Sequence, residues 1–255
     1  SLGHAAFLGF GAYSAALFAK HIHADPLLGL AVAVAATTLL GLLCAFTILR
    51  GSDLTRLMVT MGVSLILFEL ANKLDFLTGG ADGLQGVVMA ALLGRFEFDL
   101  QGQTAAWYSL TVMLLLFIVL RRMMHSPWGF SVQTLRDNAL RASAVGVAVS
   151  KVTVQVYVLA AAVAGTAGAL MAQTTGFASL DVFAVDRSAD LMLMVVIGGL
   201  GWMYGGLLGA IAFKLLHDVI SSITPQYWGF WMGLFLVVLV LVGRDRLFAV
   251  VNPFN

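Results

Sequence analysis

Charged residues are scarce in this chain: they make up 11% of its 255 residues, whereas an average soluble domain carries about 25%. Hydrophobic residues account for 60% of the sequence, and the mean hydropathy is +0.96. This balance excludes an ordinary soluble domain and is typical of a polytopic membrane protein. The formal net charge of +1 carries little information as a sum, so the distribution of charge along the chain matters instead.

Cysteine is almost absent as well, and so are the patterns that carry catalysis. The single cysteine, Cys44, lies in the apolar run from Gly41 to Leu49, and we interpret it as a packing residue. It cannot form an internal disulfide, and the sequence has no Cys/His spacing typical of a metal site. Serine-hydrolase, metalloprotease and dithiol motifs are missing, and so is the Gly-x-x-x-x-Gly-Lys-Ser/Thr phosphate loop. We therefore expect no enzymatic activity and no bound cofactor, and any use of ATP would require a partner chain.

The first residues, Ser1-Leu2-Gly3-His4, lead directly into an apolar run, with no basic region and no initiator methionine before it. A secretory signal peptide would begin with such a basic region. We therefore expect one or more further spans to precede this sequence in the full protein.

Long apolar runs fill most of the sequence, and a membrane-spanning helix needs about 20 such residues. They predict an all-α transmembrane helical bundle, one domain over residues 1–255, with about seven full spans. The predicted spans are Leu2–Lys20, Leu27–Leu49, Leu54–Leu70, Ala105–Leu120, Val152–Gln173, Met203–Ile220 and Trp228–Val242. One further run, Leu191–Gly201, is too short to cross alone, and it predicts a half-helix or one arm of a broken helix.

Basic residues gather in alternate loops between these runs. One set of loops carries Arg50, Arg56, Arg121, Arg122, Arg136, Arg141, Lys151, Arg244 and Arg246. The other set carries mostly acidic residues, namely Asp25, Asp75, Asp82, Glu97, Asp99, Asp181 and Asp186. Because basic loops stay on the cytoplasmic side of a membrane, the first set and the C-terminus are predicted to be cytoplasmic, and the acidic loops face outward.

Small residues recur three or four positions apart in several runs, which lets helix backbones approach closely in lipid. These positions are Gly9/Gly11/Ala12, Ala161/Gly165, Gly165/Ala169 and Gly205/Gly209. They predict close helix contacts, either within this chain or at an interface with another subunit.

Ionisable residues at membrane depth are candidates for function, because a charge is unfavourable there. Five qualify: His4, Glu69, Lys214, His217 and Asp218. Two i,i+4 pairs near outer helix ends, Glu69 with Lys73 and Lys214 with Asp218, predict ion pairs on the helix surface. We interpret His4 as a packing residue. The set does not extend over several depths, which argues against a proton-coupled carrier.

A short polar segment, residues 136–146, interrupts the apolar pattern on the basic side. Pro127 and Gly129 are expected to break the preceding helix, and a new helix is predicted over residues 134–145, with Gly146 ending it. Its apolar stripe consists of Leu135, Ala139, Ala142 and Val145. Such a stripe either rests on lipid headgroups or fits a groove in a soluble partner, and the residues leave both possibilities open.

Four segments resemble the LivM-type permeases of branched-chain amino-acid ABC transporters, in the same order and on the matching sides. They are Ser1–Phe7 with Gly11-Ala12-Tyr13, the loop Thr78-Gly79-Gly80-Ala81-Asp82-Gly83-Leu84, the polar segment Leu135–Gly146, and Val195–Gly201 with Gly209-Ala210. The chain departs from the family pattern at Trp202, at Gly205-Gly206 and around Leu180 and Asp181. These departures leave the class intact and the substrate open, since relatives carry urea, short amides or aromatic acids.

The resemblance implies a permease subunit of a bacterial inner-membrane importer. Its implied partners are a paralogous permease, two cytosolic ATPases that use ATP and Mg²⁺, a periplasmic substrate-binding protein and membrane lipid, with no nucleic acid. The ATPases would clamp the polar segment at Leu135, Arg136, Asp137, Asn138, Arg141, Ala142, Ala144 and Gly146. Their ATP-driven closure would rock the two permeases and change the side to which the path opens.

Which residues line the translocation path depends on how each helix is rotated about its axis. The candidates are His4, Phe7, Tyr13 and Phe183. The external loop motif comprises Thr78, Gly79, Gly80, Asp82 and Gly83. The main alternative function is a self-sufficient secondary carrier or channel for a small solute, which would favour an internal repeat that the sequence does not show. A membrane-embedded enzyme would need a polar catalytic cluster, which is lacking. Whether the permease pair is a heterodimer or a homodimer stays open.

Overall fold

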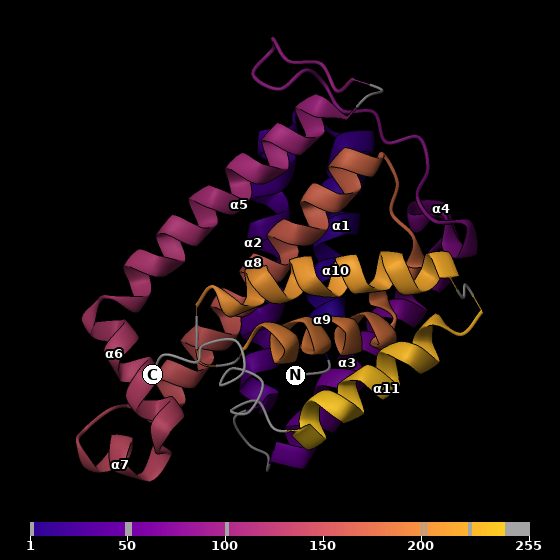
Figure 1. The fold of residues 1–255 in the computed structure, drawn as a ribbon. Coiled ribbons are helices and arrows are strands. Elements are labelled where there is room, and N and C mark those ends of the chain that lie inside the picture. The colour runs from indigo at the N-terminus through magenta and orange to yellow at the C-terminus, as the bar shows by residue number, and fades with distance from the viewer. Residues whose placement is uncertain are drawn as a thin grey trace. The chain divides into compact units, whose positions relative to one another are not determined.

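The computed structural model describes residues 3–48, 53–99, 102–199, 201, 203–223 and 226–242. Within these ranges the regular elements are helices, accompanied by two isolated β-bridges. The chain divides into two compact units, Ser1–Ser188 and Ala189–Asn255, and its course can be followed by colour in Figure 1. The predictions for Ser1, Leu2, Leu49, Arg50, Leu200, Trp202, Arg244 and Arg246 lie outside the described residues.

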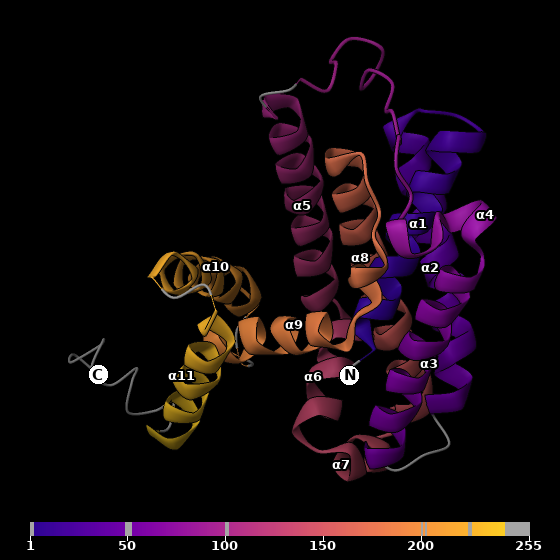
Figure 2. The ribbon, with the colours of Figure 1, turned by 90° about the vertical axis from the view of Figure 1, so that its right-hand side faces the viewer.

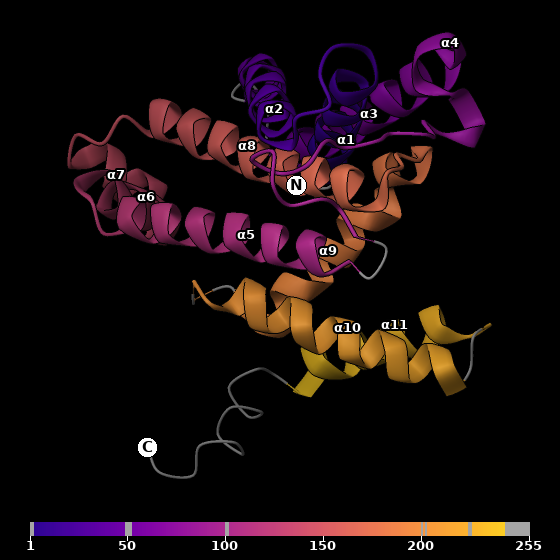
Figure 3. The ribbon, with the colours of Figure 1, turned by 90° about the horizontal axis from the view of Figure 1, so that it is seen from above.

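Helix α1 (His4–His21) lies at the centre of the first unit. It packs mainly against α8 (Val149–Thr175) and α2 (Pro26–Ile48), and also against α3 (Asp53–Lys73), as Figures 2 and 3 show. Apart from Phe7 and Tyr13, its buried residues are small, namely Ala5, Ala6, Gly9, Gly11, Ala12, Ala15 and Ala16. Small side chains let the neighbouring helices close around α1 on several sides.

Glycine brings the backbones of α1 and α8 into direct contact. A Cβ added to Gly11 would lie 2.6 Å from the Cα of Gly165, and a Cβ added to Gly168 would overlap the carbonyl of Leu8. Gly165 also faces the side chain of Thr37 in α2. The small-residue contacts that the sequence predicts for these helices are therefore formed within this chain.

We expect Gly168→Ala to destabilise the first unit, because its methyl group would overlap a main-chain carbonyl that cannot rotate away. Overpacking of an interior costs about 1–3 kcal/mol, and thermal unfolding of the purified protein in detergent measures the loss. Gly62→Ala on α3 is the matched control, because a Cβ there has nothing within 4 Å. Equal unfolding temperatures for the two variants would contradict this account of the packing.

Helix α5 (Gln103–Met124) runs beside α8 and leads into two short helices, α6 (Pro127–Asp137) and α7 (Ala139–Ala144). These two helices lie beyond the end of α5, before the chain re-enters the bundle as α8 (Figures 1 and 2). The polar segment, residues 136–146, comprises the end of α6, all of α7 and the turn that follows.

After α8 the chain turns back beside that helix in a largely non-helical stretch, residues 176–184, which we call the return segment (Figure 2). Its 3₁₀ turn η2 (Leu180–Phe183) packs against α1 and α3. Helix α9 (Val185–Gly198) then begins beside the first turn of α1, where Ser188 Oγ accepts a 3.0 Å hydrogen bond from the Ala5 N–H. The return segment therefore follows α1 back to the level at which α1 starts.

Most of α9 belongs to the second unit, together with α10 (Gly205–Ile223) and α11 (Trp228–Val242). Gly205 and Gly209 of α10 lie against the backbone of Gly198 in α9, so closely that no Cβ would fit at either position. The predicted Gly205/Gly209 contact is thus also formed within the chain.

Five helices in the described part are long and apolar enough to cross a membrane: Pro26–Phe46, Thr55–Lys73, Gln103–Met124, Val149–Thr175 and Gly205–Ile223. The predicted count of seven full spans is not confirmed. The other two predicted spans correspond to α1 and α11, which have 18 and 15 residues. Helix α1 is enclosed by protein, and a helix in that position tolerates polar residues that lipid contact would disfavour. With 14 residues, α9 agrees with the predicted short segment.

Candidate functional site

A threonine anchors the external loop motif to the end of α3. The loop contains α4 (Asp75–Thr78) and η1 (Gly80–Asp82). Thr78 is buried, and its Oγ1 lies within hydrogen-bonding distance of the carbonyls of Ala71 and Leu74. The bond to Ala71 occupies a carbonyl in the last turn of α3, where a helix leaves main-chain acceptors unpaired. The threonine of the motif therefore has a structural role in ending α3.

Three glycines of the motif take conformations that other residues rarely adopt. The φ angles of Gly79, Gly80 and Gly83 are +78°, +55° and +71°, in the region that favours glycine. A Cβ at Gly83 would also lie 2.6 Å from the carbonyl oxygen of Ala178 in the return segment. The glycines thus shape the loop, whereas the Asp82 side chain is exposed.

The external loop holds the return segment through main-chain hydrogen bonds. The Leu84 N–H donates to the Ala178 carbonyl at 2.8 Å, and the Ala178 N–H donates to the Leu84 carbonyl at 3.1 Å. A longer bond of 3.4 Å joins the Val87 N–H to the Gly176 carbonyl. Motif residues at 78–84 therefore fix the start of a segment that is almost 100 positions later in the chain.

Two of the four path candidates lie together near the start of α1. His4 is half-buried, and its ring meets Phe7 edge-on with centroids 6.2 Å apart. Phe7 is 1% exposed and meets Tyr157 of α8 at 5.6 Å. Cys44 and Ala161 complete this buried cluster, which confirms that the single cysteine is a packing residue.

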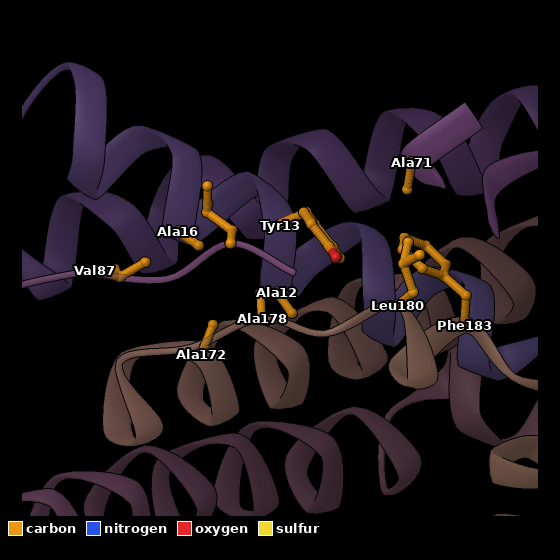
Figure 4. Close-up of a cluster of buried hydrophobic side chains, with 10 residues drawn as sticks. Ala12, Tyr13, Ala16, Ala71, Val87, Ala172, Ala178, Leu180 and Phe183 are labelled. Atoms are coloured by element: carbon orange, nitrogen blue, oxygen red, sulfur yellow. The ribbon is translucent and has the colours of Figure 1, made fainter. Parts of the chain in front are cut away.

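The other two path candidates, Tyr13 and Phe183, stack on each other with ring centroids 5.5 Å apart. They belong to a buried cluster that joins α1, α3, α8, the external loop and the return segment (Figure 4). The Phe183 ring also lies over Gly9, where no Cβ would fit. The return segment therefore rests on α1 through an aromatic contact.

The Tyr13 hydroxyl is buried without a hydrogen-bond partner among the described residues, and the same is true of Ser64 Oγ on α3. Leaving a buried hydroxyl unpaired costs about 1–3 kcal/mol. Such groups are rare, and each calls for an explanation such as a water or a functional partner. Sequence reasoning had no signal for them, because pairing depends on the folded neighbours.

Residues 134–145 are divided between the end of α6 and α7, rather than forming the single helix that the sequence predicts. Asn138 interrupts this stretch with an extended backbone (φ −162°, ψ 110°). Its side-chain oxygen accepts hydrogen bonds from the Leu140 and Arg141 N–H groups, each 3.0 Å long. Asparagine at this position caps the start of α7, and this cap is favoured over a continuation of α6 through residue 138. This cap is a local pattern that the sequence contains.

The predicted break before the polar segment is half correct. Pro127 occupies the first turn of α6, and Ser126 caps that helix by accepting from the Gly129 N–H. Gly129 is inside α6 rather than a breaker, because it packs against the carbonyl of Met124, where a Cβ would not fit. At the other end, Gly146 has φ +91° just after the last turn of α7, which confirms its role in ending the helix.

The predicted apolar stripe of the polar segment does not form as one face. Ala142 is fully buried, whereas Val145 is 78% exposed. Leu140, which the predicted stripe omitted, is the large apolar residue of α7 and is 82% exposed. The remaining coupling candidates are exposed or half-buried, and the Arg136 and Asp137 side chains form a 3.2 Å ion pair.

Residues 1–242 match a family model described as branched-chain amino acid transport system / permease component. The chain belongs to this permease family. It is similar to the high-affinity branched-chain amino acid transport system permease proteins LivM of Salmonella typhimurium and Escherichia coli, with 25% identity over 272 residues in each case. These alignments cover 96% of this chain and 62% of each relative. No solved structure matches it.

A buried polar network joins three helices of the permease at the start of α2 and near the end of α8. The Tyr108 hydroxyl of α5 donates to Gln173 Oε1 at 3.0 Å, and Gln173 Nε2 donates to the Pro26 carbonyl at 2.8 Å. Gln173 is 3% exposed. The sequence analysis gave Gln173 only as the predicted end of a span. Its role in the network could not be predicted, because it depends on neighbours that are distant in the sequence.

Tyr108→Phe should reduce stability, because the change leaves Gln173 Oε1 buried without its donor. A buried group that loses its partner costs about 1–3 kcal/mol. Thermal unfolding in detergent measures this loss. Tyr227→Phe in the second unit is a control for removal of a tyrosine hydroxyl from a side chain that is 64% exposed. An unfolding temperature equal to that of the unchanged protein would contradict the network.

Both predicted ion pairs form. Lys73 Nζ lies 3.6 Å from Glu69 Oε1 at the end of α3, and Lys214 Nζ lies 3.0 Å from Asp218 Oδ1. The second pair extends further into its helix than the sequence predicts. Lys214 lies at the midpoint of α10, and Asp218 is five residues from its end at Ile223.

Proposed function

We propose that this chain is the membrane-spanning permease subunit of an ATP-binding cassette importer in the bacterial inner membrane. It would form half of a translocation path for branched-chain amino acids or a related small polar solute. The observation that carries this proposal is the family match over residues 1–242. The five helices of membrane-spanning length support it. A paralogous permease, two cytosolic ATPases and a periplasmic binding protein would complete the importer.

In this proposal, α6 and α7 are the coupling segment, on the cytoplasmic side. Leu140 and Val145 are the contacts for an ATPase, since they are the strongly exposed large apolar side chains of α7 and the turn that follows it. An amphipathic helix that places such residues in a groove is a recurring mode of recognition. Ala142 supports the fold of α7 from inside, and Arg136 and Arg141 remain exposed for polar contacts.

The proposed path runs past the return segment. Non-helical backbone at membrane depth is tolerated where protein buries it or where it lines a water-filled cavity. Phe183 covers Gly9 and stacks on Tyr13, whose hydroxyl has no partner within the described structure. A shift of the return segment away from α1 would give this hydroxyl access to water or solute. Phe7 lies nearly two turns, and His4 about two and a half turns, before Tyr13 on the same helix.

Uptake by the assembled complex in proteoliposomes tests the proposal. We expect uptake of radiolabelled leucine or valine to require ATP, both ATPases and the binding protein. Uptake by this chain without ATPases would instead support the self-sufficient carrier. Uptake of urea or an aromatic acid in place of leucine would retain the importer class and change the cargo.

A further inference from the structure

The exposed surface of α10 is divided into two stripes of opposite character. Lys214, His217, Asp218 and Ser221 follow one another at i, i+3, i+4 and i+7, which places them on one face of a helix. We call these four residues the polar stripe. A separate face carries the exposed apolar residues Leu208, Ile211, Leu215 and Val219, which we call the apolar stripe. The buried residues of α10, Gly205, Gly209 and Phe213, form a third face.

The polar stripe holds a connected set of charges that begins at the midpoint of a helix long enough to span a membrane and extends toward its C-terminal end. Asp218 Oδ1 lies 3.0 Å from Lys214 Nζ and 3.4 Å from His217 Nδ1. The His217 ring stacks on buried Phe213, with centroids 6.4 Å apart. Lys214 is nine residues, or about 14 Å at 1.5 Å per residue, from either end of α10.

Charges at this depth rarely face lipid, and they usually line a substrate pathway or a water-filled cavity. The apolar stripe provides a separate face for lipid, so the polar stripe does not need to share it. The Glu69–Lys73 pair differs because Lys73 is the last residue of α3, whereas Lys214 lies at the midpoint of α10. The position of the lysine along its helix therefore distinguishes the two pairs.

We infer that the polar stripe of α10 lines the translocation path and binds the charged groups of a zwitterionic α-amino acid. This inference rests on the proposed importer function. An ammonium group has three N–H donors and a carboxylate has two acceptor oxygens, so each partner of the Lys214–Asp218 pair keeps capacity for a second ionic contact. The cargo carboxylate would contact Lys214, and the cargo ammonium would contact Asp218. A neutral solute such as urea offers no matching charges.

Cysteine labelling of the assembled complex in proteoliposomes tests whether the polar stripe faces water. Cys44 is the only cysteine of this chain, so Cys44→Ala provides a background without thiols in it. His217→Cys and Ser221→Cys place thiols on the polar stripe and leave the Lys214–Asp218 pair intact. Leu215→Cys and Val219→Cys are the matched controls on the apolar stripe.

A water-soluble charged methanethiosulfonate should label the polar-stripe cysteines at least about tenfold faster than the controls, because labelling needs an accessible thiolate. Excess leucine during turnover should slow labelling of the polar stripe alone. Equal labelling of the two stripes would overturn the inference.

The double variant Lys214→Gln/Asp218→Asn tests the cargo contact, and it leaves no unpaired charge in the membrane. We expect the maximal rate of leucine uptake to fall about tenfold, because charge-assisted hydrogen bonds to the cargo are lost. Glu69→Gln/Lys73→Gln removes the other pair and should leave uptake unchanged. If unchanged protein takes up leucine and the α10 variant matches it, the inference fails while the importer function stands. If unchanged protein takes up urea or an aromatic acid but no amino acid, the inference fails and the importer function stands. If it takes up none of these solutes, the proposed function fails as well.

Discussion

Replacement of Leu140 and Val145 together by glutamate should abolish ATP-dependent uptake while membrane insertion persists. These two side chains are 82% and 78% exposed on α7 and the turn that follows it. Full burial of such a side chain in a partner contributes about 1.5–3 kcal/mol, so two losses reduce binding by a factor of about 100 or more. Copurification of the ATPases with the permease measures docking, and uptake in proteoliposomes measures coupling.

Val88→Glu is the matched control for this double variant. Val88 is 75% exposed and lies in the external loop region, on the opposite side of the predicted membrane. The same substitution there should leave ATPase binding unchanged. Normal copurification and normal uptake by the Leu140/Val145 variant would show that α7 does not dock an ATPase through these residues.

Ala142 and Gly146 are less informative positions for testing coupling, although the sequence singles them out. A large charged residue at Ala142 would have to fit where the side chain is 0% exposed, so it would disturb α7 itself. Gly146 has φ +91°, and an L side chain in a left-handed conformation costs about 1–2 kcal/mol. Loss of uptake in either variant would therefore report on folding as well as docking.

Tyr13→Phe should reduce the rate of uptake about tenfold while stability is kept or raised. The change removes a buried hydroxyl that has no partner within the described residues, so the resting fold loses no hydrogen bond. If the hydroxyl bonds to water or cargo when the return segment moves, losing about 1.4 kcal/mol there slows uptake about tenfold. Thermal unfolding and uptake are measured on the same preparation.

Tyr108→Phe provides the opposite pattern, because its hydroxyl already bonds to Gln173 at 3.0 Å. That variant should lose stability, whereas Tyr13→Phe should not. Normal uptake by the Tyr13→Phe protein would show that the Tyr13 hydroxyl does not contribute to transport. A Tyr13→Phe protein with a lowered unfolding temperature would mean that its hydroxyl has a partner in the resting fold.

Several local features could be predicted from sequence because neighbouring residues determine them. The i,i+4 spacing of Glu69 and Lys73 was sufficient to predict their ion pair. The glycine at 146 ends α7 as expected. The end of α6 at Asn138 was also readable, since asparagine favours a helix cap over a helix interior. The prediction of one helix over residues 134–145 is wrong because the Asn138 cap interrupts a run of residues that otherwise favour a helix.

Sequence by itself determined that this chain is a helical membrane protein of a permease family, because hydropathy, helix length and motif order are properties of consecutive residues. Only the tertiary structure decided which face of each helix is buried. Ser188 caps α1 at Ala5, 183 positions away, and Phe183 covers Gly9. Such contacts depend on close packing between distant segments, in which a single Cβ decides whether two backbones can meet. For the same reason Ala142 proved to be buried, Leu140 exposed and the Tyr13 hydroxyl unpaired.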